Sequence, residues 1–221
     1  MPSQCRSMSR RRLAEVLALA AVAALASRTV PSTAAEPIAE GARALVQAFA
    51  GEGVLLLEDR SASLASRAER FRGLLDKYFA TDAIARWVLG RHWAQFDAGQ
   101  QREYRALFED LVVYGYVKRF GEYTGERLRI TRSLADSPTQ ATVFSEIERP
   151  AGGQPVRVDW RVGARDGVYK ITDVVVENVS LSQTWRSDFS SVIQQGGGAQ
   201  GLLRTLRERT SQLKGELGVS R

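Results

Sequence analysis

The sequence predicts an α+β protein in which a curved antiparallel sheet packs against helices from both ends of the chain. Three observations predict this class. Apolar residues recur at helical spacing over residues 36–120, alternate with polar residues over 128–176, and return to helical spacing after 181. Helices, then strands, then helices are typical of α+β domains, not of alternating α/β domains. We expect a meander of about four strands with helices on its inner face.

The first 35 residues have the features of a secretory signal peptide. Arg10, Arg11 and Arg12 precede an uncharged run of Val, Leu and Ala over residues 16–26, and small residues follow at Thr33 and Ala35. The apolar run spans only about half of a bilayer core as a helix. We therefore expect a signal peptide over 1–35, a single domain over 36–221 and a location outside the cytoplasm. The export route is Sec or, because the arginines resemble a twin-arginine signal, Tat.

Charge and cysteine content exclude several classes of function. Without the five arginines and one glutamate of the leader, the net charge falls from +6 to +2, so no nucleic-acid partner is expected. The single cysteine, Cys5, lies in the leader. The remaining chain therefore has no disulfide, thiol nucleophile or thiolate metal site. Because there is also only one histidine, we expect no metal and no cofactor.

Four helices are expected ahead of the strands. The first spans residues 38–49 and is expected to break at Gly51 and Gly53. A second begins near Ser61, because apolar residues then recur three or four positions apart. These residues are Leu64, Ala68, Phe71, Leu75 and Tyr78.

The next two helices complete this part of the chain. Thr81 or Asp82 is expected to cap a short helix that ends at Gly90. A long helix follows from about residue 98. Its inward-facing side chains are expected to be Tyr104, Leu107, Phe108, Leu111 and Val112, with Tyr114, Tyr116, Val117 and Phe120 extending an aromatic face.

The following segments alternate with a period of two, which is typical of half-buried strands. Turn-forming residues separate them at 136–138, 150–155 and 166–167. The strands are expected near residues 128–130, 141–147, 156–162 and 168–176. The last of them is apolar on both faces from Val174 to Val176, so we expect it to be the most enclosed.

Helical spacing returns at the end of the chain. One helix is expected to begin at Leu181, a glycine run over 196–198 interrupts the chain, and a last helix follows. The apolar positions are Leu181, Trp185, Phe189 and Val192 or Ile193 on the first helix, and Leu202, Leu206, Leu213 and Leu217 on the second.

The sequence shows no recognisable catalytic constellation. His92, the one histidine, follows a helix-ending glycine, where we expect a surface or packing role. Asp159 lies on the polar face of a strand and is expected to be solvated. Asp173 interrupts an apolar run and, if buried, must be paired or hydrogen-bonded; pairing with an arginine is expected over catalysis. We therefore predict a protein that is not an enzyme.

From about residue 36 to the C-terminus the chain resembles the MlaC family, also known as toluene-tolerance auxiliary substrate-binding proteins. The matching segments are residues 77–93, with Leu89-Gly90 and Trp93, then 100–108 with Tyr116, and 169–189. Each motif is degenerate, but together they follow the order of the family. Asn178 stands where the family usually has glycine, and Trp185 where tyrosine is common.

The resemblance implies a function in lipid transport. Members of the family are periplasmic carriers of phospholipid between the inner and outer membranes of Gram-negative bacteria, and one branch is associated with hopanoids. The implied ligand is a phospholipid or a hopanoid-type lipid. The implied protein partners are an inner-membrane transporter complex and an outer-membrane lipoprotein complex. The implied domain is thus a lipid-binding one.

Candidate ligand-binding residues follow from the expected interface between sheet and helices. Composition does not distinguish a filled core from a hollow one, and ordinary packing is the alternative for each residue. Arg186 is a candidate for the mouth, near a phosphate, although a solvated surface position is favoured for it. The apolar candidates are Phe108, Tyr116, Phe120, Val158, Trp160, Val175, Val179, Leu181, Trp185 and Phe189.

Two other classes of function stay open from the sequence. One is a small cone-shaped α+β isomerase or hydratase that acts on an apolar substrate with Asp173 as its base. The other is an adaptor of envelope complexes, which predicts no internal cavity at all.

Overall fold

The computed structural model describes residues 35–219, and every structural statement below concerns these residues. The predicted signal peptide lies outside them except for Ala35. The helices are α2 (Ala35–Glu58), α3 (Leu64–Tyr78), α4 (Thr81–Leu89), α5 (Ala98–Val117), α6 (Leu181–Gln195) and α7 (Gly198–Glu216), with 3-10 turns η2 (Gly90–Gln95) and η3 (Phe120–Glu122). The strands are β1 (Arg127–Ser137), β2 (Gln140–Glu148), β3 (Val156–Arg165), β4 (Val168–Val176) and β5 (Val179–Ser180).

The strands form one antiparallel meander in the order β1-β2-β3-β4-β5, which confirms the predicted fold class. The hairpins at Asp166-Gly167 and Glu177-Asn178 have two-residue turns with positive φ at both positions. Such turns match the twist of the flanking strands. Asn178, at φ 66°, replaces the glycine usual in the family, and asparagine is among the residues that tolerate this conformation.

The third strand, not the fourth, is the most enclosed. β3 pairs with β2 on one side and β4 on the other, whereas the outer neighbour of β4 is only two residues long. Four residues of β3 are buried: Val158, Asp159, Trp160 and Val162. The prediction based on the apolar run in β4 was therefore wrong, because position in the sheet outweighs local hydrophobicity.

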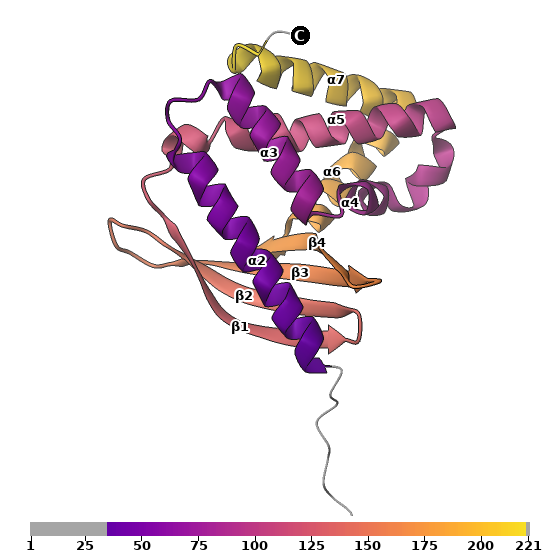
Figure 1. Cartoon of the computed structure of the whole chain (residues 1–221). Coiled ribbons are helices and arrows are strands. Elements are labelled where there is room, and N and C mark those ends of the chain that lie inside the picture. The colour runs from indigo at the N-terminus through magenta and orange to yellow at the C-terminus, as the bar shows by residue number, and fades with distance from the viewer. Residues whose placement is uncertain (1–34, 220–221) are drawn as a thin grey trace, which may run out of the picture. The chain divides into compact units, whose positions relative to one another are not determined.

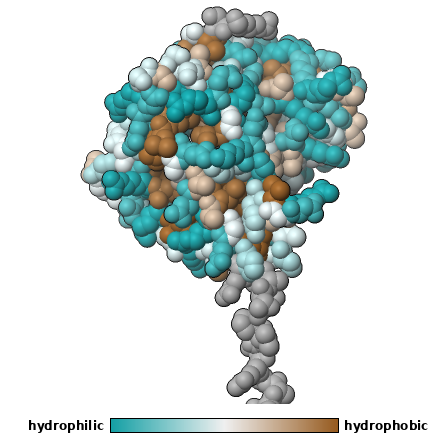
Figure 2. All heavy atoms as spheres, in the orientation of Figure 1, coloured by the Kyte–Doolittle hydropathy of each residue, from teal (hydrophilic) through white to brown (hydrophobic). Residues whose placement is uncertain are grey.

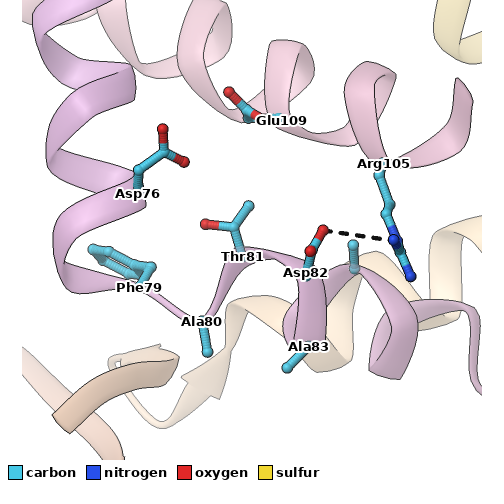
Figure 3. Close-up of a pocket in the computed structure, with 9 residues that line it drawn as sticks. Asp76, Phe79, Ala80, Thr81, Asp82, Ala83, Arg105 and Glu109 are labelled. Carbon is cyan, nitrogen blue, oxygen red and sulfur yellow. Dashed lines mark ion pairs between the residues drawn. The ribbon is translucent and has the colours of Figure 1, made fainter. Parts of the chain in front are cut away.

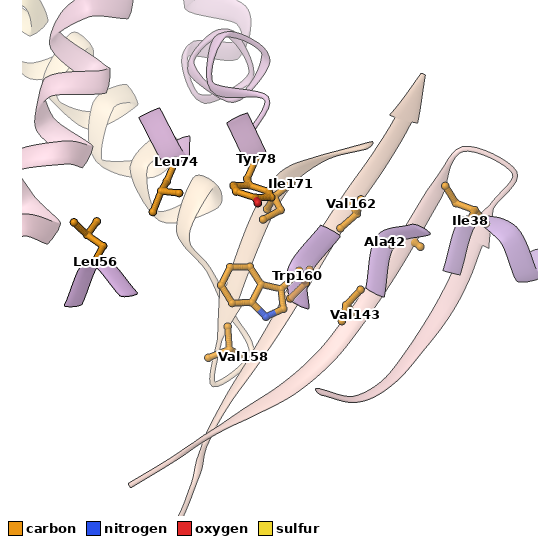
Figure 4. Close-up of a cluster of buried hydrophobic side chains, with 12 residues drawn as sticks. Ile38, Ala42, Leu56, Leu74, Tyr78, Val143, Val158, Trp160, Val162 and Ile171 are labelled. Atoms are coloured by element: carbon orange, nitrogen blue, oxygen red, sulfur yellow. The ribbon is translucent and has the colours of Figure 1, made fainter. Parts of the chain in front are cut away.

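Helix α2 lies across one face of the sheet, as Figure 1 shows. Near its start, Ile38 and Ala42 are buried over the sheet residues Val143 and Val162 (Figure 4). The helix continues through Gly51 and Gly53, so the predicted break is wrong. Each glycine costs about 1 kcal/mol of helix propensity. The apolar run that follows still buries Leu56, and we attribute the continuation of the helix to this burial.

The remaining helices form a second group above one end of the sheet, with α5 beside α7 (Figure 1). Asp97 and Gln100 form a capping box at the start of α5. Ala80 is the N-cap of α4 and no side chain caps it, so the predicted cap at Thr81 or Asp82 was wrong. Gly90, at φ 51°, ends α4 as predicted.

A buried aromatic residue organises this helical group. Tyr104 on α5 is fully buried among Phe96, Phe108 and Phe189. Its hydroxyl donates a hydrogen bond of 3.0 Å to the carbonyl of Ala85, and burial raises its pKa. Among residues 35–219 no helix has the length and hydrophobicity that a membrane span requires.

Candidate functional site

An apolar cavity of about 390 Å³ lies between the sheet and the helices. Hydrocarbon forms nearly all of its surface, and the polar exceptions are Thr81, Asp173 and Ser182. Its apolar wall comes from Phe49, Leu57, Phe71, Leu75, Phe79, Ile84, Phe108, Val112, Tyr116, Phe120, Ile147, Trp160, Val174, Leu181 and Trp185. The wall residues thus come from the five helices α2 to α6, from the 3-10 turn η3 and from strands β2 to β4.

Aromatic rings packed edge to face frame the cavity. The ring centroid of Phe49 lies 5.5 Å from that of Trp160 and 5.2 Å from that of Phe79. Phe71 and Phe120 form a second pair, with centroids 5.2 Å apart. Such pairs contribute about 0.5–1.5 kcal/mol beyond area burial, so they help to hold the wall in place around the space.

The polar edge of Trp160 is satisfied within the sheet. Its indole N–H donates to the hydroxyl of Ser145 over 2.9 Å, and this hydroxyl donates to the carbonyl of Val158 over 2.6 Å. A buried N–H group without a partner would cost about 1–3 kcal/mol. The indole can therefore present its apolar surface to the cavity.

A second hollow, of about 450 Å³, forms the mouth of the cavity. The two share seven lining residues, among them Phe49, Tyr116 and Trp160. Hydrophobic atoms reach the surface over the C-terminal part of α2, where Leu55 is exposed (Figure 2). The polar rim of the mouth comes from Arg119, Glu122, Tyr123 and Glu126.

Tyr116 connects the cavity with its mouth. Heavy atoms surround its hydroxyl, and this burial raises the pKa of Tyr116, while the cation of Arg119 opposes the shift. The side chain is nevertheless 36% accessible. Since Tyr116 lines both hollows, we attribute this accessible surface to the hollows and not to the outer face of the protein.

A polar cluster around Asp173 borders the cavity away from the mouth. The carboxylate accepts hydrogen bonds from the hydroxyl of Ser180 over 2.7 Å and from the backbone N–H and hydroxyl of Ser182. Arg161 lies 3.4 Å from it. The predicted arginine pairing of Asp173 is thus confirmed. These donors engage both carboxylate oxygens and tie β4 to the start of α6, an arrangement that favours a structural role over that of a general base.

A separate polar pocket of about 470 Å³ lies between α3, α4 and α5 (Figure 3). Asp82 faces Arg105, with 3.7 Å between Oδ1 and Nε. Glu109 is bound by Arg72 on α3. The charges at this pocket are therefore partly compensated by ion pairs. Within residues 35–219 no three His, Cys, Asp or Glu side chains gather as a metal site would require.

The two other residues weighed from the sequence are both buried. His92 packs inside the fold, with Nε2 3.2 Å from the hydroxyl of Ser190, in agreement with the expected packing role. Asp159 is paired with Arg157 over 2.6 Å, so the prediction of a solvated carboxylate was wrong. The outer face of β3 is thus more covered than its polar pattern indicates.

Six of the eleven predicted ligand-binding residues line the apolar cavity. Their contact with a ligand stays a prediction. They are Phe108, Tyr116, Phe120, Trp160, Leu181 and Trp185.

The other five predicted residues lie elsewhere. Val158 is packed in the core, and Phe189 packs against Tyr104 inside the helical group. Val179 is 57% exposed in the short strand β5. Val175 lies on the opposite face of β4 from the cavity-lining Val174.

Arg186 is not among the residues that line the mouth. Its guanidinium lies over the Trp87 ring, 4.7 Å from the centroid, and donates to the carbonyl of Trp87 over 3.2 Å. The side chain projects from α6 toward α4, on a different side of the helix from Leu181 and Trp185, whose spacing of four residues places them on one face. The predicted position of Arg186 at the cavity mouth was wrong.

The sequence interpretation missed part of the wall. Phe71 belongs to the apolar stripe of α3, and Phe49 ends the predicted first helix, so both were assigned to helices but not to a ligand site. The other missed residues include Leu57, Phe79, Val112, Ile147 and Val174. Helix α2 supplies part of this surface because it continues past the two glycines.

Comparisons with known proteins agree with this architecture. A family model described as MlaC protein matches residues 54–208. Among solved structures, the chain is similar to a phospholipid-binding protein from Ralstonia solanacearum, solved in complex with a phospholipid. The TM-score is 0.68 at 24% identity, over 78% of this chain and 98% of that chain, which shows a shared fold. No curated protein matches the chain.

Proposed function

The chain belongs to the MlaC family, and on this premise we propose that it is a lipid-binding protein that holds the acyl chains of a phospholipid in the cavity between sheet and helices. The observation that carries the proposal is the nearly complete hydrocarbon lining of this cavity. The phospholipid bound by the Ralstonia protein of the same fold supports it. The adaptor hypothesis predicted no internal cavity, and the structure contradicts that prediction.

The volume of the cavity suits hydrocarbon chains. Ligand pockets commonly measure about 300–1,000 Å³. If a methylene group occupies about the volume of a water molecule in the liquid, about 30 Å³, the cavity of about 390 Å³ has room for about 13 such groups. That is close to one acyl chain, so the second chain of a diacyl lipid would occupy the mouth.

Binding of this kind needs no chemical step. Each buried methylene contributes about 0.8 kcal/mol, or roughly 12 kcal/mol for a chain of 16 carbons. A bilayer offers the same chain a similar environment, so transfer between membrane and cavity is close to balance. The direction of net transfer then depends on the partners. We accordingly propose a binding protein and not an enzyme.

The proposal extends to location and partners. The leader over residues 1–35 supports export to the periplasm. There the protein would carry a phospholipid, or a hopanoid-type lipid, between an inner-membrane transporter complex and an outer-membrane lipoprotein complex. The resemblance to the MlaC family and the membership in it support this role.

Mass spectrometry tests the proposal directly. The folded protein is measured under native conditions, and lipid is then extracted after denaturation and identified. We expect one bound lipid per protein, absent when the protein is denatured before exposure to lipid. A protein that is consistently free of lipid, and that takes none from phospholipid vesicles, would contradict the proposal.

A further inference from the structure

The rim of the mouth carries two hydrogen-bond donors without a protein partner. Within residues 35–219, the guanidinium of Arg119 makes no ion pair or hydrogen bond, and the hydroxyl of Tyr116 makes no hydrogen bond. Arg60 is different, because its guanidinium donates to the carbonyl of Tyr123 over 3.2 Å. A tyrosine hydroxyl is protonated at neutral pH, so that of Tyr116 can donate a hydrogen bond.

The same rim also carries two carboxylates. Glu126 accepts hydrogen bonds from the backbone N–H and the hydroxyl of Thr124, at 2.8 and 2.9 Å, and these bonds lower its pKa. Glu122 makes no ion pair within the described part of the chain. The rim therefore combines a free cation and a free anion, with a second anion held by the protein.

We propose that this rim is a head-group site that prefers zwitterionic phospholipids over anionic ones. The phosphate accepts hydrogen bonds from the Arg119 guanidinium and the Tyr116 hydroxyl, and the ammonium group of the lipid pairs with Glu122. Phosphatidylglycerol and phosphatidic acid have no ammonium group and leave both carboxylates facing their negative charge. This inference rests on the proposed function, because the chains must occupy the cavity for the head group to reach the rim.

The position of Tyr116 supports this placement. A lipid whose chains fill the apolar cavity has its polar end at the mouth, and Tyr116 lines both. The phosphate then lies where hydrocarbon surface gives way to the charged rim. A phosphodiester is a strong acceptor for a guanidinium, which offers several N–H donors in one plane.

Competitive uptake from mixed vesicles tests the inference. The protein is incubated with vesicles containing phosphatidylethanolamine, phosphatidylglycerol and phosphatidic acid in equal amounts, and the captured lipids are identified by mass spectrometry. The variants are Arg119→Gln, Tyr116→Phe and Glu122→Gln. Arg204→Gln is the matched control, because Arg204 is exposed on α7 and lines none of the cavities described above.

We expect the wild type and Arg204→Gln to be enriched in phosphatidylethanolamine. Arg119→Gln should lower total uptake by about two- to fivefold, the range for a partly exposed charge interaction. Tyr116→Phe should lower it by less. Glu122→Gln should lower the uptake of phosphatidylethanolamine, and with it the enrichment, since it removes the partner of the ammonium group.

Three outcomes would overturn the inference. Uptake without head-group preference, unchanged in Arg119→Gln, would leave lipid binding intact but remove the head-group site. Absence of uptake in the wild type would refute the proposed function itself and the inference with it. If inorganic phosphate binds at Arg119 as strongly in lipid-free protein as in lipid-loaded protein, the rim is a site for a free anion and not for a lipid head group.

Discussion

The two ends of α2 meet the sheet in different ways. Near its start, Ile38, Ala42 and Val46 are almost completely buried in a filled core (Figure 4). Toward its end, Phe49 and Leu57 border the apolar cavity. One continuous amphipathic helix thus contributes to a packed region and to a hollow one.

A close contact between the helix backbone and a tyrosine ring distinguishes the filled end. A Cβ atom on Gly41 would lie 2.3 Å from the ring of Tyr169, so only glycine permits this contact between helix and strand. Gly53, which lines the mouth, has open space instead. The comparison teaches that hydrophobic content does not decide whether an interface is filled, and that the approach of the elements does.

The largest difference in stability is expected between two valine-to-alanine variants, one at the filled end of α2 and one at its hollow end. Val46→Ala should lower the free energy of unfolding by about 2–3 kcal/mol, because two buried carbons are lost and a void remains. Val54→Ala, at the mouth on the same helix, should cost less than about 0.5 kcal/mol. Urea unfolding measures both. Equal losses would show that the mouth is as tightly packed as the core.

The boundary of the hollow region can be tested at Asp173. Asp173→Asn should destabilise by about 1–3 kcal/mol, because an amide cannot accept all the hydrogen bonds from Ser180 and Ser182. Asp166→Asn, in an exposed hairpin, should be neutral. Thermal unfolding compares the two. If Asp173→Asn left the stability unchanged but abolished a turnover, the enzyme hypothesis would be preferred.

Alanine at glycine positions of α2 should have opposite effects at its two ends. Gly51→Ala should stabilise by about 0.5–1 kcal/mol, since nothing obstructs its methyl group and helix propensity improves. Gly41→Ala should give a net loss of about 1 kcal/mol, because displacing Tyr169 outweighs that gain. Denaturant midpoints decide the signs. A stabilising Gly41→Ala would refute the close approach.

The smallest expected effect concerns the stability of the protein at acidic pH. It involves Asp59, which directly follows the last residue of α2. Hydrogen bonds from Ser61 and Arg70 lower the pKa of Asp59 to about 2, against an ordinary 3.8. The ionised Asp59 carboxylate therefore stabilises the folded protein fully above the ordinary pKa of 3.8, and this stabilisation is lost as the pH falls through about 2. The difference in Tm between the wild type and Asp59→Asn should shrink as the pH is lowered over this range. A constant difference would contradict the shifted pKa.

The sequence predicted the element order well because periodicity is a local property. The prediction failed where contacts with distant parts of the chain determine the structure. At Gly51 and Gly53, helix propensity favours the end of the helix, but the helix continues because Leu56 is buried. Asp159 was misplaced for a similar reason, since nothing local indicates that a strand's polar face is covered.

The candidate site shows the same limit more sharply. The register of β4 shifts by one residue between Ile171 and Asp173, as in a β-bulge, and this moves Val174, not Val175, to the cavity face. The sequence is apolar at Val174, Val175 and Val176, so it does not indicate which of them faces the cavity. The predicted residues that line the cavity, such as Phe108 and Trp160, are large aromatics on predicted inward faces. Whether the space between them is empty depends on element separation, which the sequence does not encode locally.

The most direct test of the account introduces a tryptophan at each of two neighbouring positions, of which only one borders the cavity. Val112 lines the cavity, whereas Val113 is fully buried in packed core on the same helix. Lipid load by native mass spectrometry and Tm are measured for Val112→Trp and Val113→Trp. We predict that Val112→Trp keeps its Tm and loses lipid, while Val113→Trp unfolds at a lower temperature. A Val112→Trp protein that is destabilised as strongly as Val113→Trp, or that still carries a full load of lipid, would contradict the account.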